Sequence, residues 1–340
     1  MRDRTVLLLF SVGALIYVNI YHHSVVEWRM KSLSKLELDY NHIFDLNLIP
    51  WPNLTRPNVS TMDEVRELGP FDIKTSAGQQ RSLEILIEEF KKAMTDAHLE
   101  GHWFLHAGAL LGSIQHHDFI PWDDDANFKL HIKHRPAVQA ILKKLAPKFH
   151  TYTMRLRDKL FFAPFNSSIT LTSNSIGSHY DAELPWGWPF IDISYFEEFK
   201  PNMCQDYRDH SKRYLLSDIF PLTYRPLGKQ WFPVPRRPVN FLKSYYNTKG
   251  QVCESHIRSH FTGSVTGAVI EDCRKLMDQY PFVHRCLVSS NEFIEQHSGL
   301  CDEYLLNGRG HVIHKIRLPL DADECASSFY TIRHESFKCP

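Results

Sequence analysis

Pro121-Trp122-Asp123-Asp124-Asp125 leads directly into an alternating run of apolar and polar residues at positions 126–132. An alternation with a period of two predicts a β-strand that buries one face. The same period would place Asp123, Asp125 and Asn127 on one face of that strand. Three adjacent carboxylates repel one another, and holding them together is costly unless a cation or a phosphate-bound metal offsets the repulsion. The stretch therefore predicts an acidic site at a strand.

A glycine turn, Gly108-Ala109-Leu110-Leu111-Gly112-Ser113, lies just upstream of the acidic residues. Residues 102–106 form a short strand candidate before it, and residues 109–115 form a small helix or turn after it. Strand, glycine turn and helix in this order are typical of segments that surround a phosphate.

The remaining pattern predicts an α/β domain. Apolar residues spaced by three and four from Arg81 predict a helix that ends at Gly101, and residues 136–144 predict another. Strands are expected at 151–156, 159–162 and 169–172, which would form a meander, and at 190–195. The last of these sends Asp192 to the face opposite Ile191 and Ile193, so a second strand can offer a carboxylate to the first.

Carboxylates on neighbouring strands can hold Mg²⁺ or Mn²⁺ and leave coordination positions for phosphate oxygens. The competing interpretation is a solvated acidic turn, which we would favour for three aspartates without context. The tryptophan, the glycine turn and the following strand shift the balance toward a site.

The motif Gly108–Ser113, then His116, then Phe119-Ile120-Pro121-Trp122-Asp123-Asp124-Asp125 resembles the signature of the LicD/fukutin-related family of phosphotransferases. The resemblance extends from about residue 81 to 246, with Trp188-Pro189-Phe190-Ile191-Asp192-Ile193 similar to a later acidic strand of the family. It implies a nucleotidyltransferase-like mixed sheet flanked by helices.

The resemblance also implies a reaction and a site. A phospho-alcohol, such as phosphocholine or ribitol phosphate, would pass from a CDP-activated donor to a hydroxyl of a glycan or glycoprotein, with Mg²⁺ or Mn²⁺. The implied catalytic residues are Asp123, Asp124 and Asp125, and the implied metal ligands are Asp123, Asp125 and Asp192. Gly112 and Ser113 would meet the donor phosphates through backbone N–H groups, and His116 would lie near them.

A basic stretch with aromatic neighbours runs from Arg225 to Lys243. Arg236 and Arg237 within it would supply countercharge to a pyrophosphate donor, and a solvated loop is the alternative interpretation.

Two positions depart from the family pattern. Asn127 stands where the family usually has an aspartate, which reduces the charge of the site by one and should weaken Mg²⁺ binding. Gln115 stands where it usually has an arginine, a possible phosphate contact. Both favour the alternative function, a catalytically inactive LicD-like lumenal protein that binds glycan or assists an active relative. A metal-dependent hydrolase is a third possibility.

Length and charge narrow the class further. The 340 residues contain 39 basic and 39 acidic side chains, so no net field favours a nucleic-acid partner. A hydrophobic content of 43% is ample for a large core.

The N-terminal residues 5–21 are apolar and follow Arg2 and Arg4, which predicts a transmembrane signal-anchor. A cleaved signal peptide is the alternative. With the anchor, residues 1–4 would be a cytosolic tail, 22–75 a lumenal stem, 76–250 the LicD-like domain and 251–340 a cysteine-rich C-terminal extension. The protein would be a single-pass type II protein of the Golgi or endoplasmic reticulum membrane.

All seven cysteines lie in the second half without the CxxC spacing of a zinc site, so we expect disulfides with at least one cysteine outside an intramolecular pair. The C-terminal third is expected to mix short helices with loops. Glycosylation sequons begin at Asn53, Asn58 and Asn166.

Overall fold

The computed structural model describes residues 44–164, 172–180, 184–246, 252–255, 259–261, 263–265, 267–288 and 299–340. The expected membrane anchor, the cytosolic tail, the first part of the stem and the Asn166 sequon lie outside these ranges. None of the helices within them has the length and apolar character needed to cross a bilayer.

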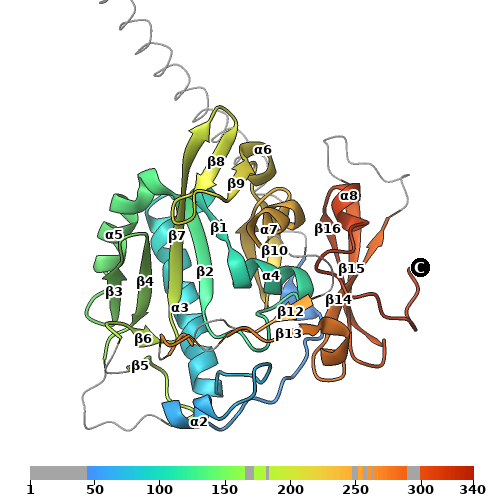
Figure 1. Cartoon of the computed structure of the whole chain (residues 1–340), viewed down its shortest axis with the longest axis horizontal. Coiled ribbons are helices and arrows are strands. Elements are labelled where there is room, and N and C mark those ends of the chain that lie inside the picture. The colour runs from blue at the N-terminus through green and yellow to red at the C-terminus, as the bar shows by residue number, and fades with distance from the viewer. Residues whose placement is uncertain are drawn as a thin grey trace, which may run out of the picture.

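A mixed sheet of seven strands forms the centre of the molecule (Figure 1). Its main path runs β1 (Trp103–Leu105), β2 (Ala126–His131), β7 (Ile191–Lys200), β4 (Arg157–Phe162) and β3 (Phe149–Thr153). The far half of β7 continues into β8 (Met203–Asp206) and β9 (Arg213–Leu215). Strands β2 and β7 are parallel and the other pairs are antiparallel. The predicted mixed α/β sheet is therefore confirmed, and so is the pairing of the first two strands of the expected meander, as β3 and β4. The third strand expected there, at 169–172, lies almost wholly outside the described residues.

Helices flank this sheet. Helix α3 (Ala77–Asp96) begins four residues before Arg81, because Ser76 and Gln79 form a capping box at its N-terminus. It buries Leu83, Leu86 and Phe90 completely or nearly so. Helix α5 (Arg135–Lys143) packs beside α3, and α4 (Ala107–Gln115) contacts both β2 and α7 (Pro238–Tyr246).

Smaller elements complete the described chain. They are the helices α2 (Met62–Arg66), α6 (Leu216–Ile219) and α8 (Ala322–Cys325), the 3₁₀ turns η2 (Leu46–Leu48), η3 (Glu100–His102), η4 (Ile132–His134) and η5 (Cys273–Leu276), and the strand pairs β5 (His179–Tyr180) with β6 (Gly187–Trp188), β10 (Thr223–Leu227) with β11 (Gln230–Val234), and β12 (Val252–Glu254) with β13 (Ile270–Asp272).

The C-terminal part contains a separate antiparallel sheet of β14 (Phe282–Leu287), β15 (Leu300–Leu306) and β16 (Val312–Pro319). Our expectation of short helices and loops was wrong here. Strand β15 is buried along almost its whole length, so its sequence lacks the polar alternation that indicates a strand. The sheet lies beside α4 in Figure 1.

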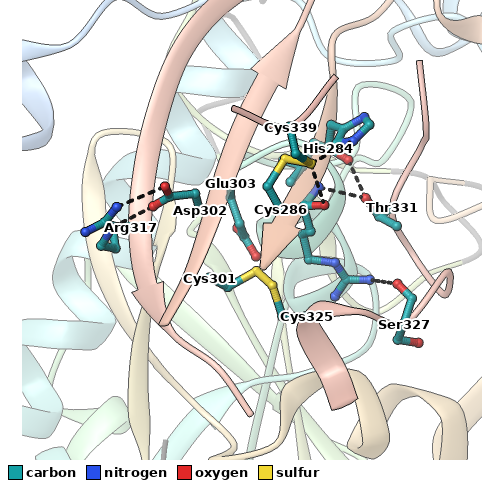
Figure 2. Close-up of a disulfide and its surroundings, with 12 residues drawn as sticks. His284, Cys286, Cys301, Asp302, Glu303, Arg317, Cys325, Ser327, Thr331 and Cys339 are labelled. Atoms are coloured by element: carbon teal, nitrogen blue, oxygen red, sulfur yellow. Dashed lines mark hydrogen bonds and ion pairs between the residues drawn. A yellow bond between two sulfur atoms is a disulfide. The ribbon is translucent and has the colours of Figure 1, made fainter. Parts of the chain in front are cut away.

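Three disulfides confirm the expectation drawn from the cysteines. Cys286–Cys339 and Cys301–Cys325 fasten the last segment of the chain to β14 and β15 (Figure 2), and Cys253–Cys273 links β12 to the turn after β13. Cys204 is buried and forms no disulfide.

A buried polar network joins the C-terminal sheet to the β10–β11 hairpin and to the segment after α4. Glu303 on β15 accepts from Arg225 Nη2 on β10 (2.6 Å) and pairs with His117 Nε2 (2.8 Å). His117 Nδ1 in turn contacts His314 Nε2 at 2.9 Å. Burial alone would raise the pKa of Glu303, but Arg225 and His117 hold this pKa at about 2. The C-terminal sheet is thus attached through a charge that remains ionised in the interior.

This attachment can be tested with two matched arginine variants. Arg225→Met should lower the free energy of unfolding by about 3–5 kcal/mol, because it leaves the buried Glu303 carboxylate without its cation. Arg317→Met removes one of two cations beside Asp302, the preceding residue of the same strand. The arginine is 41% exposed and Lys315 stays paired with the carboxylate, so this variant should cost only about 0–1 kcal/mol. Urea denaturation followed by circular dichroism measures both. Equal losses would show that burial of the Arg225–Glu303 pair does not set its contribution to the attachment of the C-terminal sheet.

Candidate functional site

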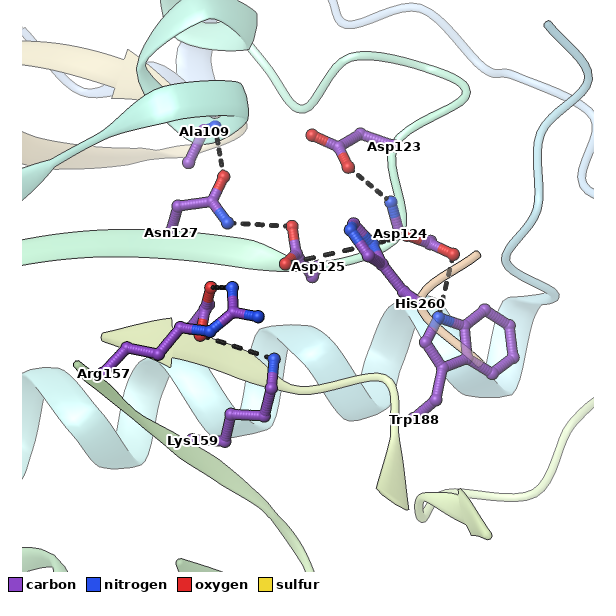
Figure 3. Close-up of polar contacts among 10 residues, drawn as sticks. Ala109, Asp123, Asp124, Asp125, Asn127, Arg157, Lys159, Trp188 and His260 are labelled. Carbon is purple, nitrogen blue, oxygen red and sulfur yellow. Dashed lines mark hydrogen bonds and ion pairs between the residues drawn. The ribbon is translucent and has the colours of Figure 1, made fainter. Parts of the chain in front are cut away.

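The acidic residues lie where the two parallel strands begin. Asp123, Asp124 and Asp125 form the turn immediately before β2, and Asp192 is the second residue of β7. The register places Asn127 directly beside Asp192. Figure 3 shows the surroundings of this site.

Strand β2 begins only at Ala126. The prediction that alternation places Asp123 on this strand was therefore wrong. The three aspartates have different partners instead. Asp123 Oδ1 accepts from the Asp124 backbone N–H (2.9 Å), and Asp125 Oδ1 accepts from Asn127 Nδ2 (3.0 Å). Asp125 and Asn127 do share a side, as expected.

Asp124 points into the protein. Its Oδ2 accepts from the Trp188 indole N–H (2.9 Å), and its Oδ1 pairs with Nδ1 of His260. An ionised carboxylate only accepts hydrogen bonds, so His260 Nδ1 is the donor when Asp124 is ionised. Figure 3 shows Trp188 and His260 next to this carboxylate.

Helix α4 begins against the acidic turn. The Ala109 N–H donates to Asn127 Oδ1 at 3.3 Å, so the positive end of the helix faces the carboxylates. Two glycines let α4 pack closely on the segment at 118–123. A Cβ at Gly108 would lie 2.1 Å from Asp123 Oδ2, and one at Gly112 would lie 2.5 Å from the backbone oxygen of Asp118.

Crowding changes the acidity of Asp125. Burial raises the pKa of its carboxyl to about 7, and the charges of Asp123, Asp192 and Asp124 add to this effect, while His260 opposes it. The side chain is therefore poised to gain or lose a proton near neutral pH.

Asp192 is held as an anion by two cations on β4. Arg157 Nη1 lies 2.7 Å from Asp192 Oδ2, and Lys159 Nζ lies 3.4 Å from Asp192 Oδ1. Burial alone would raise the pKa of Asp192, but Lys159 and Arg157 together lower it. Neighbouring Lys159 is buried against Phe190, with its Nζ 3.3 Å from the ring centre.

One group at this site has the spacing of metal ligands. Donor atoms of Asp123, Asp124 and His260 all lie within 4.8 Å of one another. Two carboxylates and an imidazole suit a divalent cation, and the nitrogen donor favours Mn²⁺ over Mg²⁺, which prefers oxygen ligands. Within the described residues this group contains neither Asp125 nor Asp192. No pattern in the sequence indicated His260, an isolated histidine 136 residues away from Asp124 along the chain that the fold places beside it.

The predicted donor-binding residues are buried or paired with other residues of the protein. Ser113 is fully buried in α4, and its hydroxyl has no hydrogen-bond partner among the residues that the structure describes. His116 is buried against Trp122 and Phe282, with Nδ1 2.8 Å from the Pro281 oxygen, and burial lowers its pKa to about 4. Arg237 pairs with Asp321 (3.0 Å), and Arg236 donates to the Ser217 oxygen (2.7 Å). Their role toward a donor stays a prediction.

Comparison with protein families gives one match. Residues 101–237 match the model described as LicD/FKTN/FKRP, nucleotidyltransferase domain. The matched range contains Asp123, Asp124, Asp125 and Asp192 but ends before His260. A search of curated proteins returned no match.

The two glycines of α4 predict different outcomes for the same substitution. Gly108→Ala should leave stability near that of the wild type, because only the end of the Asp123 side chain must move. Mn²⁺ affinity should fall about 10–100-fold, because the variant displaces Asp123, a candidate ligand. Gly112→Ala collides with backbone and should cost about 2 kcal/mol or more. Calorimetric Mn²⁺ titration and urea denaturation separate the two effects. Unchanged Mn²⁺ affinity in Gly108→Ala would exclude Asp123 as a ligand.

The raised pKa of Asp125 predicts a pH-dependent gain in stability for Asp125→Asn in EDTA. Between the pKa of the unfolded chain, about 4, and the folded pKa of about 7, the wild-type folded state keeps a proton that the unfolded state has lost. Its free energy of unfolding should therefore fall as pH rises, by at most about 1.4 kcal/mol per pH unit. The advantage of Asp125→Asn should grow over this range and level off above it. A difference that is constant from pH 4 to 8 would contradict the raised pKa.

Proposed function

We propose that this chain, which belongs to the LicD-type family through its domain at residues 101–237, transfers a phospho-alcohol from a CDP-activated donor to a hydroxyl of a glycan. Phosphocholine and ribitol phosphate exemplify the group transferred. The observation that carries the proposal is the meeting of four carboxylates, two cations and a helix N-terminus at the start of β2 and β7. Phosphoryl-type transfer depends mainly on positioning and charge neutralisation, and this arrangement supplies both.

Asp123, Asp124 and His260 are our candidates to hold a divalent cation, Mn²⁺ or Mg²⁺. When bound, the cation would neutralise negative charge on the donor pyrophosphate. Trp188 fixes the orientation of Asp124, because its indole N–H occupies the oxygen that does not face His260. This assignment keeps Asp123 from the sequence prediction and replaces Asp125 and Asp192 with Asp124 and His260.

Asp125 is our candidate for the general base. Its Oδ1 is occupied by the Asn127 amide, so Oδ2 is the atom that would accept the proton of the acceptor hydroxyl. Its pKa is raised to about 7 without a cation, and a cation on Asp123 and Asp124 would lower it, so the carboxylate would be ionised and able to accept a proton at neutral pH.

Arg157 and Lys159 are our candidates to face the donor phosphates. Arg157 is 26% exposed, so it can reach a ligand while it remains paired with Asp192. The N-terminal N–H groups of α4 offer further positive potential to a phosphate.

We also place the protein in the secretory pathway, as a type II membrane protein of the Golgi or endoplasmic reticulum. Three disulfides support an oxidising compartment, and the apolar residues 5–21 support an anchor.

A catalytically inactive glycan-binding or accessory protein is the second candidate. The specific observation in its favour is that Asp192 already has its charge balanced by Arg157 and Lys159, so this carboxylate does not require a metal.

Metal and nucleotide binding by the purified full-length protein test the proposal. We expect Mn²⁺-dependent binding of CDP, which Asp124→Asn should weaken at least tenfold through loss of the cation. Asp125→Asn should instead keep CDP affinity within about threefold and lower the transfer rate by about 10²–10⁴-fold, as loss of a general base does. Calorimetry measures binding, and the mass gain of a glycan acceptor measures transfer.

Asp96→Asn is the matched control, because Asp96 is an exposed acid of α3 paired with Lys92. It should change neither quantity. CDP binding that is absent or independent of metal would reject the enzyme and favour the accessory protein. Donor breakdown without any acceptor would indicate a hydrolase.

A further inference from the structure

A cavity of about 440 Å³ lies away from the acidic residues, between four segments that are distant in the sequence. Its walls come from residues 51–56, from α3, from the loop at 118–119 and from the turn between β10 and β11. This volume is within the range of about 300–1,000 Å³ typical of small-molecule sites. Neither the family match nor the proposed reaction assigns it a role.

Charge balance is the first property of the lining. Three basic side chains, Arg56, Arg81 and Lys229, face three acidic ones, Glu84, Glu88 and Asp118. Arg81 Nη1 lies 3.1 Å from Glu84 and 3.5 Å from Glu88, and all three are substantially exposed. A phosphate or nucleotide would gain from the cations but would also approach three carboxylates. The lining therefore favours a neutral ligand with many hydrogen-bonding groups.

Unused hydrogen-bonding capacity is the second property. Within the described residues, the Arg56 guanidinium hydrogen-bonds through Nη1 alone, to the backbone and hydroxyl oxygens of Thr75. Asp118 uses one oxygen to accept from the Phe119 N–H at 2.8 Å, and burial raises its pKa to about 6. Adjacent donors and acceptors of this kind match the paired hydroxyls of a sugar ring.

An aromatic wall is the third property. Trp51 lines the cavity and is half-buried. Its indole N–H is committed to the Leu46 oxygen at 2.7 Å, and its ring packs against His314 with centres 4.7 Å apart. The ring is thus fixed in place, and a fixed aromatic surface combined with planar polar side chains suits the apolar face and the hydroxyl edge of a pyranose.

We propose that this cavity binds a neutral pyranose unit of a glycan. Two sources share this chemistry. One is the first sugar of a glycan on Asn53, an exposed residue of the lining that begins the sequon Asn53-Leu54-Thr55. The other is an acceptor glycan, in which case the inference rests on the proposed function and names a subsite for its substrate.

Free sugars test the cavity without any measurement of activity. The full-length protein made without glycosylation is titrated with N-acetylglucosamine, mannose and galactose, and saturation-transfer NMR reports binding. We expect at least one sugar to bind, and Glu84→Ala and Lys229→Ala each to weaken it about fivefold or more. Both residues lie at the accessible rim, so the variants should fold. Lys92→Ala, on the same helix but outside the lining and 68% exposed, is the control and should bind as the wild type does.

The source is then distinguished with glycosylated protein. If the Asn53 glycan occupies the cavity, glycosylated protein will not bind the free sugar, and Asn53→Gln will restore binding. If the glycosylated protein binds as well as the unglycosylated one, the ligand comes from another molecule. No binding of any of the three sugars to unglycosylated protein, or binding that Glu84→Ala and Lys229→Ala leave unchanged, overturns the proposal. Preferential binding of inorganic phosphate or CMP that Arg81→Ala abolishes overturns it too, because the ligand would then be an anion. Since these measurements do not depend on CDP or transfer, they can fail while the transferase stands, and the reverse also holds.

Discussion

Mutual repulsion of four carboxylates is the constraint on which the site and much of its surroundings depend. Asp123, Asp124 and Asp125 are adjacent in sequence, and the parallel pairing of β2 and β7 adds Asp192. Each carboxylate has different neighbouring groups that offset its charge. Asp192 is paired with two cations, Asp124 accepts from Trp188 and contacts His260, and Asp123 faces the start of α4. Asp125 accepts from Asn127 and lies 3.9 Å from His260 Nδ1, but burial and the neighbouring carboxylates outweigh these contacts, and its pKa rises to about 7. The residue that the fold leaves least stabilised as an anion is thus the one best suited to exchange a proton.

Compensation of these charges requires parts of the chain that lie far from the acidic turn. Trp188 belongs to β6, Arg157 and Lys159 belong to β4, and His260 comes from beyond the family-matched range. The C-terminal sheet is attached nearby through His116, which packs on Trp122, and through His117 and Arg225, which contact Glu303. The C-terminal part therefore contributes to the geometry of the acidic turn as well as to stability.

Sequence patterns predicted the central strands, α3, α4 and α5 and the acidic turn, because local alternation and helical spacing record which face of each element is buried. These patterns failed to predict features that depend on residues distant in the sequence. Strand β15 is buried on both faces and lacks alternation, and a single histidine at position 260 carries no spacing that indicates a ligand. The period-two argument also placed Asp123 on a strand that begins only at Ala126. The order of β4 beside β7, which delivers Arg157 and Lys159 to Asp192, is a property of the tertiary structure alone.

The contacts of Asn127 change the interpretation that its sequence position suggested. From sequence it is a missing negative charge that should weaken a metal site. In the structure both ends of its amide are used, since Oδ1 accepts from the Ala109 N–H and Nδ2 donates to Asp125. An aspartate in this place could keep the first contact but could not donate the second, and it would add a charge beside a carboxyl whose pKa is already raised. Asn127 thus connects the N-terminus of α4 to the proposed base and limits the repulsion there, so its presence alone is no argument that the site is inactive.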